Sequence, residues 1–226
     1  MDTVYMENRM PDSTFKEEDR RLYVIFSSTP FKMGRLIRFF TRAKYNHVSL
    51  SIDPALGEIY SFARRHRNTP FYGGFVRESG TRFRCGNKLS HVQICELPIT
   101  EAQYREAKAI LETMKAHSEE YVYNFFSAFL YPLHRRVRLP NAYTCVEFVA
   151  DFLVKLGVPS LPDQVHHYSI KELERVLAVH SVYCGVCPLP IEKDGFDQHQ
   201  SFFRATALTA KSHAKLIKSF VKHKIF

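Results

Sequence analysis

The chain has 226 residues, which is enough for one or at most two domains. Hydrophobic residues make up 45% of it, with 19 Phe and 12 Tyr, so a sizeable core can form and a wholly disordered chain is excluded. No apolar run reaches the length that crosses a bilayer, and the first residues lack the apolar segment of a secretory signal. Five cysteines form no disulfide framework and suit a reducing compartment, so we expect a cytoplasmic protein.

The net charge of +9 is unevenly distributed along the chain. Residues 201–226 contain six basic residues and no acidic one, so they carry most of the excess. A groove for nucleic acid would spread its positive charge through the fold, and this distribution therefore disfavours a nucleic-acid partner.

Taken in chain order, the patterns predict strands and helices that alternate irregularly. Residues 22–26, 46–52, 58–62, 91–97 and 181–183 have the β-branched, aromatic or alternating pattern of strands. A short helix is predicted over 32–41, and capping boxes at Thr100, Thr144 and Ser169 predict three more, of which the first runs to 117 and the second ends at 157. The Pro- and Gly-containing stretch up to residue 74 is expected to be an ordered loop.

These elements indicate an α+β protein with an antiparallel sheet packed against helices. We expect residues 1–20 to be a flexible leader, 21–190 to form one domain and 191–226 to form a basic tail.

Cys145 is the first candidate for chemistry. The capping box makes Thr144 the N-cap and places Cys145 in the first helical position, where unpaired N–H groups and the helix dipole favour a thiolate. A thiolate is a competent nucleophile, and the same N–H groups can stabilise an oxyanion. The alternative is a buried structural cysteine.

His47 is the candidate base. It opens a strand in which Val48, Leu50 and Ile52 form the apolar side, so its side chain lies off that side with Ser49. Across the following hairpin, Ser61 is the polar residue that is best placed to pair with it. The alternative is a surface imidazole.

Three segments together carry a family resemblance: residues 46–52 (NHVSLSI), 59–62 (IYSF) and 143–149 (YTCVEFV). They resemble the circularly permuted branch of the papain-like, NlpC-type hydrolases, which includes the YiiX-like amidases and, more distantly, the lecithin retinol acyltransferase group. In ordinary NlpC-type enzymes the cysteine helix precedes the histidine strand, whereas here His47 precedes Cys145. The resemblance covers about residues 22–183 and implies a permuted papain-like fold.

The resemblance implies that Cys145 is the nucleophile and His47 the general base. It places Ser61 at the third catalytic position, where family members usually carry Glu or His. A serine cannot carry charge but could orient the ring through a hydrogen bond. Glu58 or Asp53 could supply the charge instead.

Residues 121–126 (YVYNFF) are similar to a Tyr-Asn-Phe stretch that precedes the cysteine helix in relatives. Tyr123, Asn124 and Thr144 are therefore candidates for substrate binding. The alternative for the aromatic residues is core packing.

Cys184 and Cys187 form a C-x-x-C motif without a second pair. His166 and His167 could complete a zinc site with them, but the spacing fits no standard finger. A plain loop is the preferred interpretation, and no metal or other cofactor is expected.

The tail has a helical repeat of apolar residues, which we call the outer stripe. Its members are Phe203, Ala207, Ala210, Ala214, Ile217 and Val221. Lys211, Lys215, Lys218 and Lys222 lie off the stripe. Such a helix could lie on an anionic membrane as a peripheral protein does, or it could dock on the protein's own core.

The resulting functional hypothesis is a cysteine hydrolase or acyltransferase that acts on a peptide or lipid amide or ester through an acyl-cysteine. The alternative is a catalytically silent relative that serves as a membrane- or partner-binding module, which the uncharged Ser61 favours.

Overall fold

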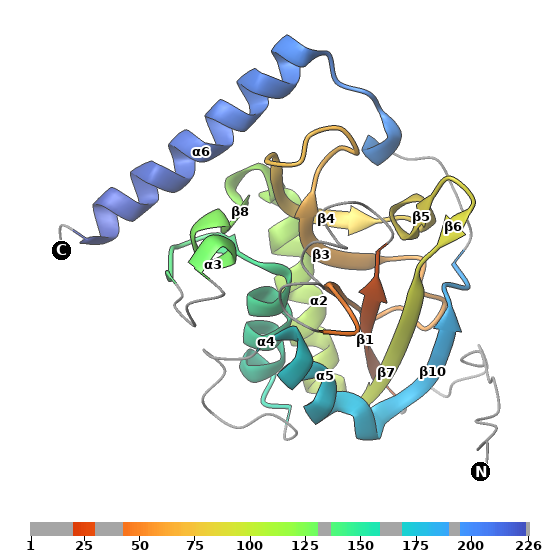
Figure 1. Ribbon diagram of the computed structural model, residues 1–226. Coiled ribbons are helices and arrows are strands. Elements are labelled where there is room, and N and C mark those ends of the chain that lie inside the picture. The colour runs from red at the N-terminus through yellow and green to blue at the C-terminus, as the bar shows by residue number, and fades with distance from the viewer. Residues whose placement is uncertain (1–19, 30–42, 131–136, 159–168, 190–194, 225–226) are drawn as a thin grey trace.

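The computed structural model describes residues 20–29, 43–130, 137–158, 169–189 and 195–224 (Figure 1). The predicted leader and the predicted helix over 32–41 lie outside these residues, apart from Arg20. The protein is α+β, as expected, with a sheet in the order β10-β7-β1-β2-β3-β4 in which all neighbours are antiparallel. Its strands are β1 (Arg21–Ser28), β2 (His47–Ser51), β3 (Ile59–Arg64), β4 (Gly73–Glu78), β7 (His91–Pro98) and β10 (Ser181–Val186).

Two small sheets accompany the large one. Strands β5 (Arg84–Cys85) and β6 (Lys88–Leu89) are antiparallel, whereas β8 (Val122–Tyr123) and β9 (Ala142–Tyr143) are parallel. Short 3-10 turns are η1 (Gly80–Phe83), η2 (Ser118–Glu120), η5 (Ala178–His180) and η6 (Gly195–Asp197).

The described helices are α2 (Glu101–Ala116), α3 (Phe125–Leu130), α4 (Cys145–Lys155), α5 (Ile170–Leu177) and α6 (Phe202–Lys224). Three of them, α2, α4 and α5, bury their apolar sides against one face of the large sheet, whereas α3 and α6 pack around β8 and β9. Residues of α2, α4 and α5 share one core cluster with the sheet, and these helices gather on the same side of it in Figure 1. All three predicted capping boxes are formed, because Thr100, Thr144 and Ser169 each accept from the backbone three residues later.

The side chains of strand β1 contribute alternately to two hydrophobic clusters, one on each face of the sheet. Leu22, Val24 and Phe26 pack on the helix side, while Tyr23 and Ile25 pack on the other face. A strand in the middle of a sheet that is covered on both faces is apolar without interruption, which is the pattern seen in the sequence.

The structure corrects two predicted boundaries. The stretch up to residue 74 is not a loop throughout, because it contains the end of β3 and the start of β4, a strand that the sequence analysis did not predict. Strand β10 runs to Val186, so Cys184 lies in a strand and not in a loop.

The basic tail forms the predicted helix, α6, but it docks through a face other than the outer stripe. Leu216 is buried against Val122, Leu139 and Ala142, and the ring of Phe220 lies 5.0 Å from that of Phe126. All six members of the outer stripe are exposed. Docking of the stripe on the protein itself, one of the two alternatives, is therefore wrong.

Candidate active site

Strand β9 leads directly into the N-terminus of α4 and positions Cys145 there. Thr144 has extended backbone angles and its Oγ1 accepts from Glu147 N at 3.2 Å, while its own N–H donates to Glu147 Oε2 at 2.7 Å. Cys145 follows as the first helical residue and is 7% exposed. The predicted placement of Cys145 is confirmed.

His47 opens β2 and binds a carboxylate that the sequence analysis missed. Its Nε2 lies 2.6 Å from Oε1 of Glu78, the last residue of β4, which is only 4% exposed. The Cys145 side chain lies close enough to the His47 ring to contribute to the rise in its pKa. His47 and Cys145 are thus neighbours although 98 positions separate them in the sequence, as expected for two residues of one site.

The surroundings of His47 favour the charged imidazolium. Burial alone would lower its pKa, but the Glu78 carboxylate, the interaction with the Cys145 side chain and the hydrogen bond to Glu78 outweigh burial and raise it from 6.5 to about 10. The ring therefore carries a proton at neutral pH.

Glu78 shows the opposite response. Burial would raise its pKa, but the charge and hydrogen bond of His47 lower it below 4.5, with further contributions from the Arg82 charge and from the Ser61 hydroxyl. A negative carboxylate and a positive imidazolium thus stabilise each other inside the protein. The other carboxylate oxygen, Oε2, is buried without a hydrogen-bond partner among the described residues.

The predicted roles of Ser61, Asp53 and Glu58 need correction. Ser61 is fully buried on β3 and donates to Glu78 Oε1, so it orients the carboxylate and does not itself contact the ring. Asp53 accepts from backbone amides of its own turn, and Glu58 accepts from the Tyr60 hydroxyl, so neither supplies the charge at His47. That charge comes from Glu78.

Tyr123, a predicted substrate-binding residue, lies near Cys145. Burial raises its pKa well above the usual 10, and electrostatic interactions with Cys145 and Glu147 raise it further. Its ring also packs 4.9 Å from that of Phe125. The phenol is therefore a neutral neighbour of Cys145.

Two glycines allow β8, which carries Tyr123, to approach β4. A Cβ atom on Gly73 would lie 2.9 Å from Tyr123 Cβ, and one on Gly74 would collide with the carbonyl oxygen of Tyr121. Glycine is needed at these two positions because the two backbones approach each other closely. The glycines therefore do not mark a loop.

The other two predicted substrate-binding residues are used within the fold. Asn124 is 1% exposed, and its amide bonds Ser127 and the carbonyl of Val137 at the start of α3. Thr144 uses its hydroxyl to cap α4. The structure therefore gives no support for contact between these side chains and a substrate, although Thr144 does position Cys145.

The remaining cysteines lie in different surroundings. Burial raises the pKa of Cys95 to about 12 and that of Cys187 to about 11. Cys184 is exposed, with Lys44 Nζ 3.7 Å from its sulfur. Within the described ranges no three His, Cys, Asp or Glu residues are grouped as metal ligands, and His166 and His167 lie outside those ranges.

Two hollows in the surface lie away from Cys145. One of about 410 Å³ is lined by residues that include Arg65, Phe75 and Lys115, and one of about 320 Å³ is lined by residues that include Pro54 and Tyr104. Neither lining contains Cys145, His47 or Glu78. The candidate site is therefore identified by the contacts of these side chains and not by a cavity.

Comparisons with family models, with curated proteins and with solved structures found no match for this chain. The functional argument therefore depends on the residues and their geometry.

Glu78 is the functional residue that sequence reasoning missed. A signal was present, because Phe75 and Val76 have strand character directly before the Ser79-Gly80 break. A strand there would follow β3 and could pair with it, which would bring Glu78 into the sheet. The strand was not predicted because two adjacent glycines, at positions 73 and 74, are typical of a loop.

Proposed function

We propose that the protein is a cysteine-dependent hydrolase or acyltransferase with a permuted papain-like fold, which cleaves an amide or ester through an acyl-cysteine. The observation that carries this proposal is the chain of contacts from Cys145 through His47 to Glu78. It combines a thiol at a helix N-terminus, a base in contact with that thiol and a buried carboxylate that orients the base.

The first step uses the pair of Cys145 and His47. Because Nε2 of the ring faces Glu78, Nδ1 is the nitrogen left for the sulfur. The thiolate forms a bond from Sγ to the substrate carbonyl carbon, and the electron pair of the C=O π bond moves to oxygen. The electron pair on oxygen then re-forms the C=O bond, His47 donates its proton to the leaving nitrogen or oxygen, and the bond from that atom to carbon breaks, which leaves the acyl-cysteine.

The capping box leaves donors for the developing oxyanion. It engages the amides of Thr144 and Glu147, and the amide of Phe148 donates to the Thr144 carbonyl. The amides of Cys145 and Val146 belong to the first turn, where N–H groups have no partner within the helix. These two groups are our candidates for the oxyanion hole.

The second step releases the acyl group. His47 takes a proton from water, or from another hydroxyl or amine acceptor, as that molecule attacks the acyl-cysteine. The carbon–sulfur bond then breaks, and the thiolate and the imidazolium are restored. The acceptor decides between hydrolysis and acyl transfer, and no cofactor takes part in either route.

A catalytically silent binding module remains the second hypothesis. The feature that favoured it was the uncharged Ser61 at the third position. Because Glu78 supplies a carboxylate to His47, the lack of charge at Ser61 no longer argues against catalysis. The enzyme is therefore the better supported function.

A thiol-directed assay tests the proposal. The full-length protein should hydrolyse a p-nitrophenyl acyl ester with a burst of nitrophenol, and brief iodoacetamide treatment should alkylate Cys145 and stop turnover. Cys145→Ser should abolish both, whereas Cys184→Ser, which removes an exposed cysteine, is the matched control and should retain both. If alkylation falls mainly on Cys184 while Cys145 stays unmodified, the enzyme proposal is wrong.

A further inference from the structure

Helix α6 has two separate apolar surfaces, and only one of them is covered by described residues. The covered surface includes Leu216 and Phe220, which pack against β8, β9 and α3. The outer stripe is the other surface, and every one of its residues is exposed. A helix on the surface of a protein needs only one apolar side to dock on the protein. The second apolar side of α6 therefore requires another explanation.

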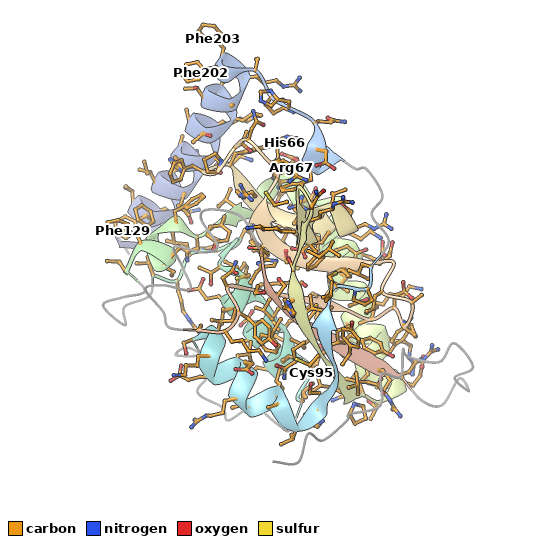
Figure 2. The ribbon with its side chains drawn as sticks, turned by 45° about the vertical axis from the view of Figure 1, so that its right-hand side comes forward. His66, Arg67, Cys95, Phe129, Phe202 and Phe203 are labelled. Atoms are coloured by element: carbon orange, nitrogen blue, oxygen red, sulfur yellow. The ribbon has the colours of Figure 1, made fainter. Side chains whose placement is uncertain are left out.

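The exposed apolar area is extended by aromatic rings at both ends of the helix. Phe202 and Phe203 are 78% and 84% exposed at its start, and Phe129 of α3 is 85% exposed. Figure 2 shows Phe202 and Phe203 together at one end of α6 and Phe129 beside the other end. Ile217 and Val221 continue the stripe between these ends as exposed aliphatic side chains.

Positive charge follows one side of the outer stripe. With 3.6 residues per turn, Lys211, Lys218 and Lys222 lie along the same flank of the helix, and all three are exposed. Lys215 lies on this flank as well, but its Nζ donates to the Glu119 carbonyl at 2.7 Å and so helps to hold α6 in place. Residues 201–226 contain no Asp or Glu.

We propose that the outer stripe and its lysine flank form a binding surface for anionic phospholipid bilayers. In this arrangement the stripe, together with Phe202 and Phe129, enters the boundary between headgroups and acyl chains, and the lysines meet lipid phosphates and carboxylates. Helix α6 would lie flat on the surface and not cross it, since no helix of the described chain is long and apolar enough to span a bilayer.

The charge pattern argues against a second copy of the chain as the occupant. Packing two stripes together would bring lysine flanks near each other with no acidic residue on either α6 to offset them. A peptide partner would be expected to use a groove, and neither of the two hollows described above is lined by any α6 residue. A flat anionic surface fits both the exposed stripe and the charge.

Vesicle flotation of the full-length protein tests the proposal. The protein should float with mixed phosphatidylcholine–phosphatidylserine vesicles, less so at high salt, and only weakly with pure phosphatidylcholine. The triple change Lys211→Gln, Lys218→Gln and Lys222→Gln should weaken binding roughly a hundredfold, from about fivefold per lysine. The pair Ile217→Ser and Val221→Ser should weaken it by roughly tenfold or more.

Matched controls keep the test specific to α6. Lys88→Gln with Lys171→Gln removes exposed positive charge elsewhere, and Val179→Ser removes an exposed apolar side chain elsewhere, so neither should change flotation. Equal loss in the controls would show non-specific attraction and overturn the proposal. Failure of the unchanged protein to float with either vesicle would also overturn it, as would a dimer that Ile217→Ser dissociates in the absence of lipid binding.

Discussion

His47 Nε2 lies 2.6 Å from Glu78 Oε1, although strand β3 separates the two strands that carry these residues. The contact bridges three strands, because Ser61 of β3 donates to the same carboxylate oxygen. Correct pairing of β2, β3 and β4 is therefore a condition for a charged His47, and the site is assembled only when this part of the sheet is complete.

Replacing Glu78 should return His47 towards its ordinary behaviour. In Glu78→Gln the carboxylate charge is lost, so the pKa of His47 should fall from about 10 towards or below 6.5, because burial then dominates. Turnover of a p-nitrophenyl ester at neutral pH should fall about 10²–10⁴-fold, the range for a misplaced acid–base group. An NMR titration of the imidazole protons measures the pKa directly.

Glu58→Gln is the matched control for this change, since Glu58 is an acid that the sequence offered as an alternative charge and its carboxylate accepts from Tyr60. It should leave both the His47 titration and the turnover unchanged. A shift of equal size in the two variants would refute the assignment of Glu78.

The ion pair should also give stability a characteristic pH dependence. The raised pKa of His47 stabilises the fold below pH 6.5, and this contribution is lost as the pH rises through about 10. The lowered pKa of Glu78 stabilises the fold above pH 4.5, and this contribution is lost as the pH falls through its folded-state value.

The free energy of unfolding of the unchanged protein should therefore exceed that of His47→Asn most between pH 4.5 and 6.5. Urea unfolding of both proteins across this range measures the difference. A constant difference from pH 4 to 10 would contradict the predicted coupling, because loss of packing alone does not titrate.

The fold was more predictable from sequence than the site. Strand periodicity and the capping boxes predicted β2, α2 and α4 and the position of Cys145, because these depend on local spacing. The partner of His47 was mispredicted, since both the hairpin and the family resemblance indicated Ser61. The true partner, Glu78, lies on the next strand, β4. That strand was not predicted because it begins with two glycines, which are typical of a loop.

Ser61→Ala should show how much the Ser61 hydroxyl stabilises the fold through its hydrogen bond to Glu78. It removes a hydroxyl that donates to buried Glu78, so the free energy of unfolding should fall by about 1.5–3 kcal/mol, as for a hydrogen bond to a charged group. Ser49→Ala is the control, because its equally buried hydroxyl makes only a 3.5 Å contact with the Ile25 carbonyl and should cost less. Urea unfolding measures both, and equal losses would show that the contact with Glu78 contributes nothing specific.

Gly74→Ala should disturb the approach of β8 to β4. The new Cβ would collide with the Tyr121 carbonyl, and overpacking of this kind costs about 1–3 kcal/mol. Gly195→Ala is the control, since a Cβ there meets no atom within 4 Å. Thermal unfolding should therefore show a lower midpoint for the first variant alone, and an unchanged midpoint for both would refute the close approach.

Thr144→Ala should reduce both stability and the reactivity of Cys145. Loss of the N-cap bond to Glu147 should lower the free energy of unfolding by about 1 kcal/mol. Cys145 should also react more slowly with iodoacetamide, because the frayed first turn no longer holds its N–H groups beside the sulfur. Ser169→Ala is the matched control, since it removes an equivalent cap from α5 and costs similar stability, but it should leave alkylation of Cys145 unchanged. Equal slowing in both variants would mean that reactivity follows global stability and not the helix N-terminus.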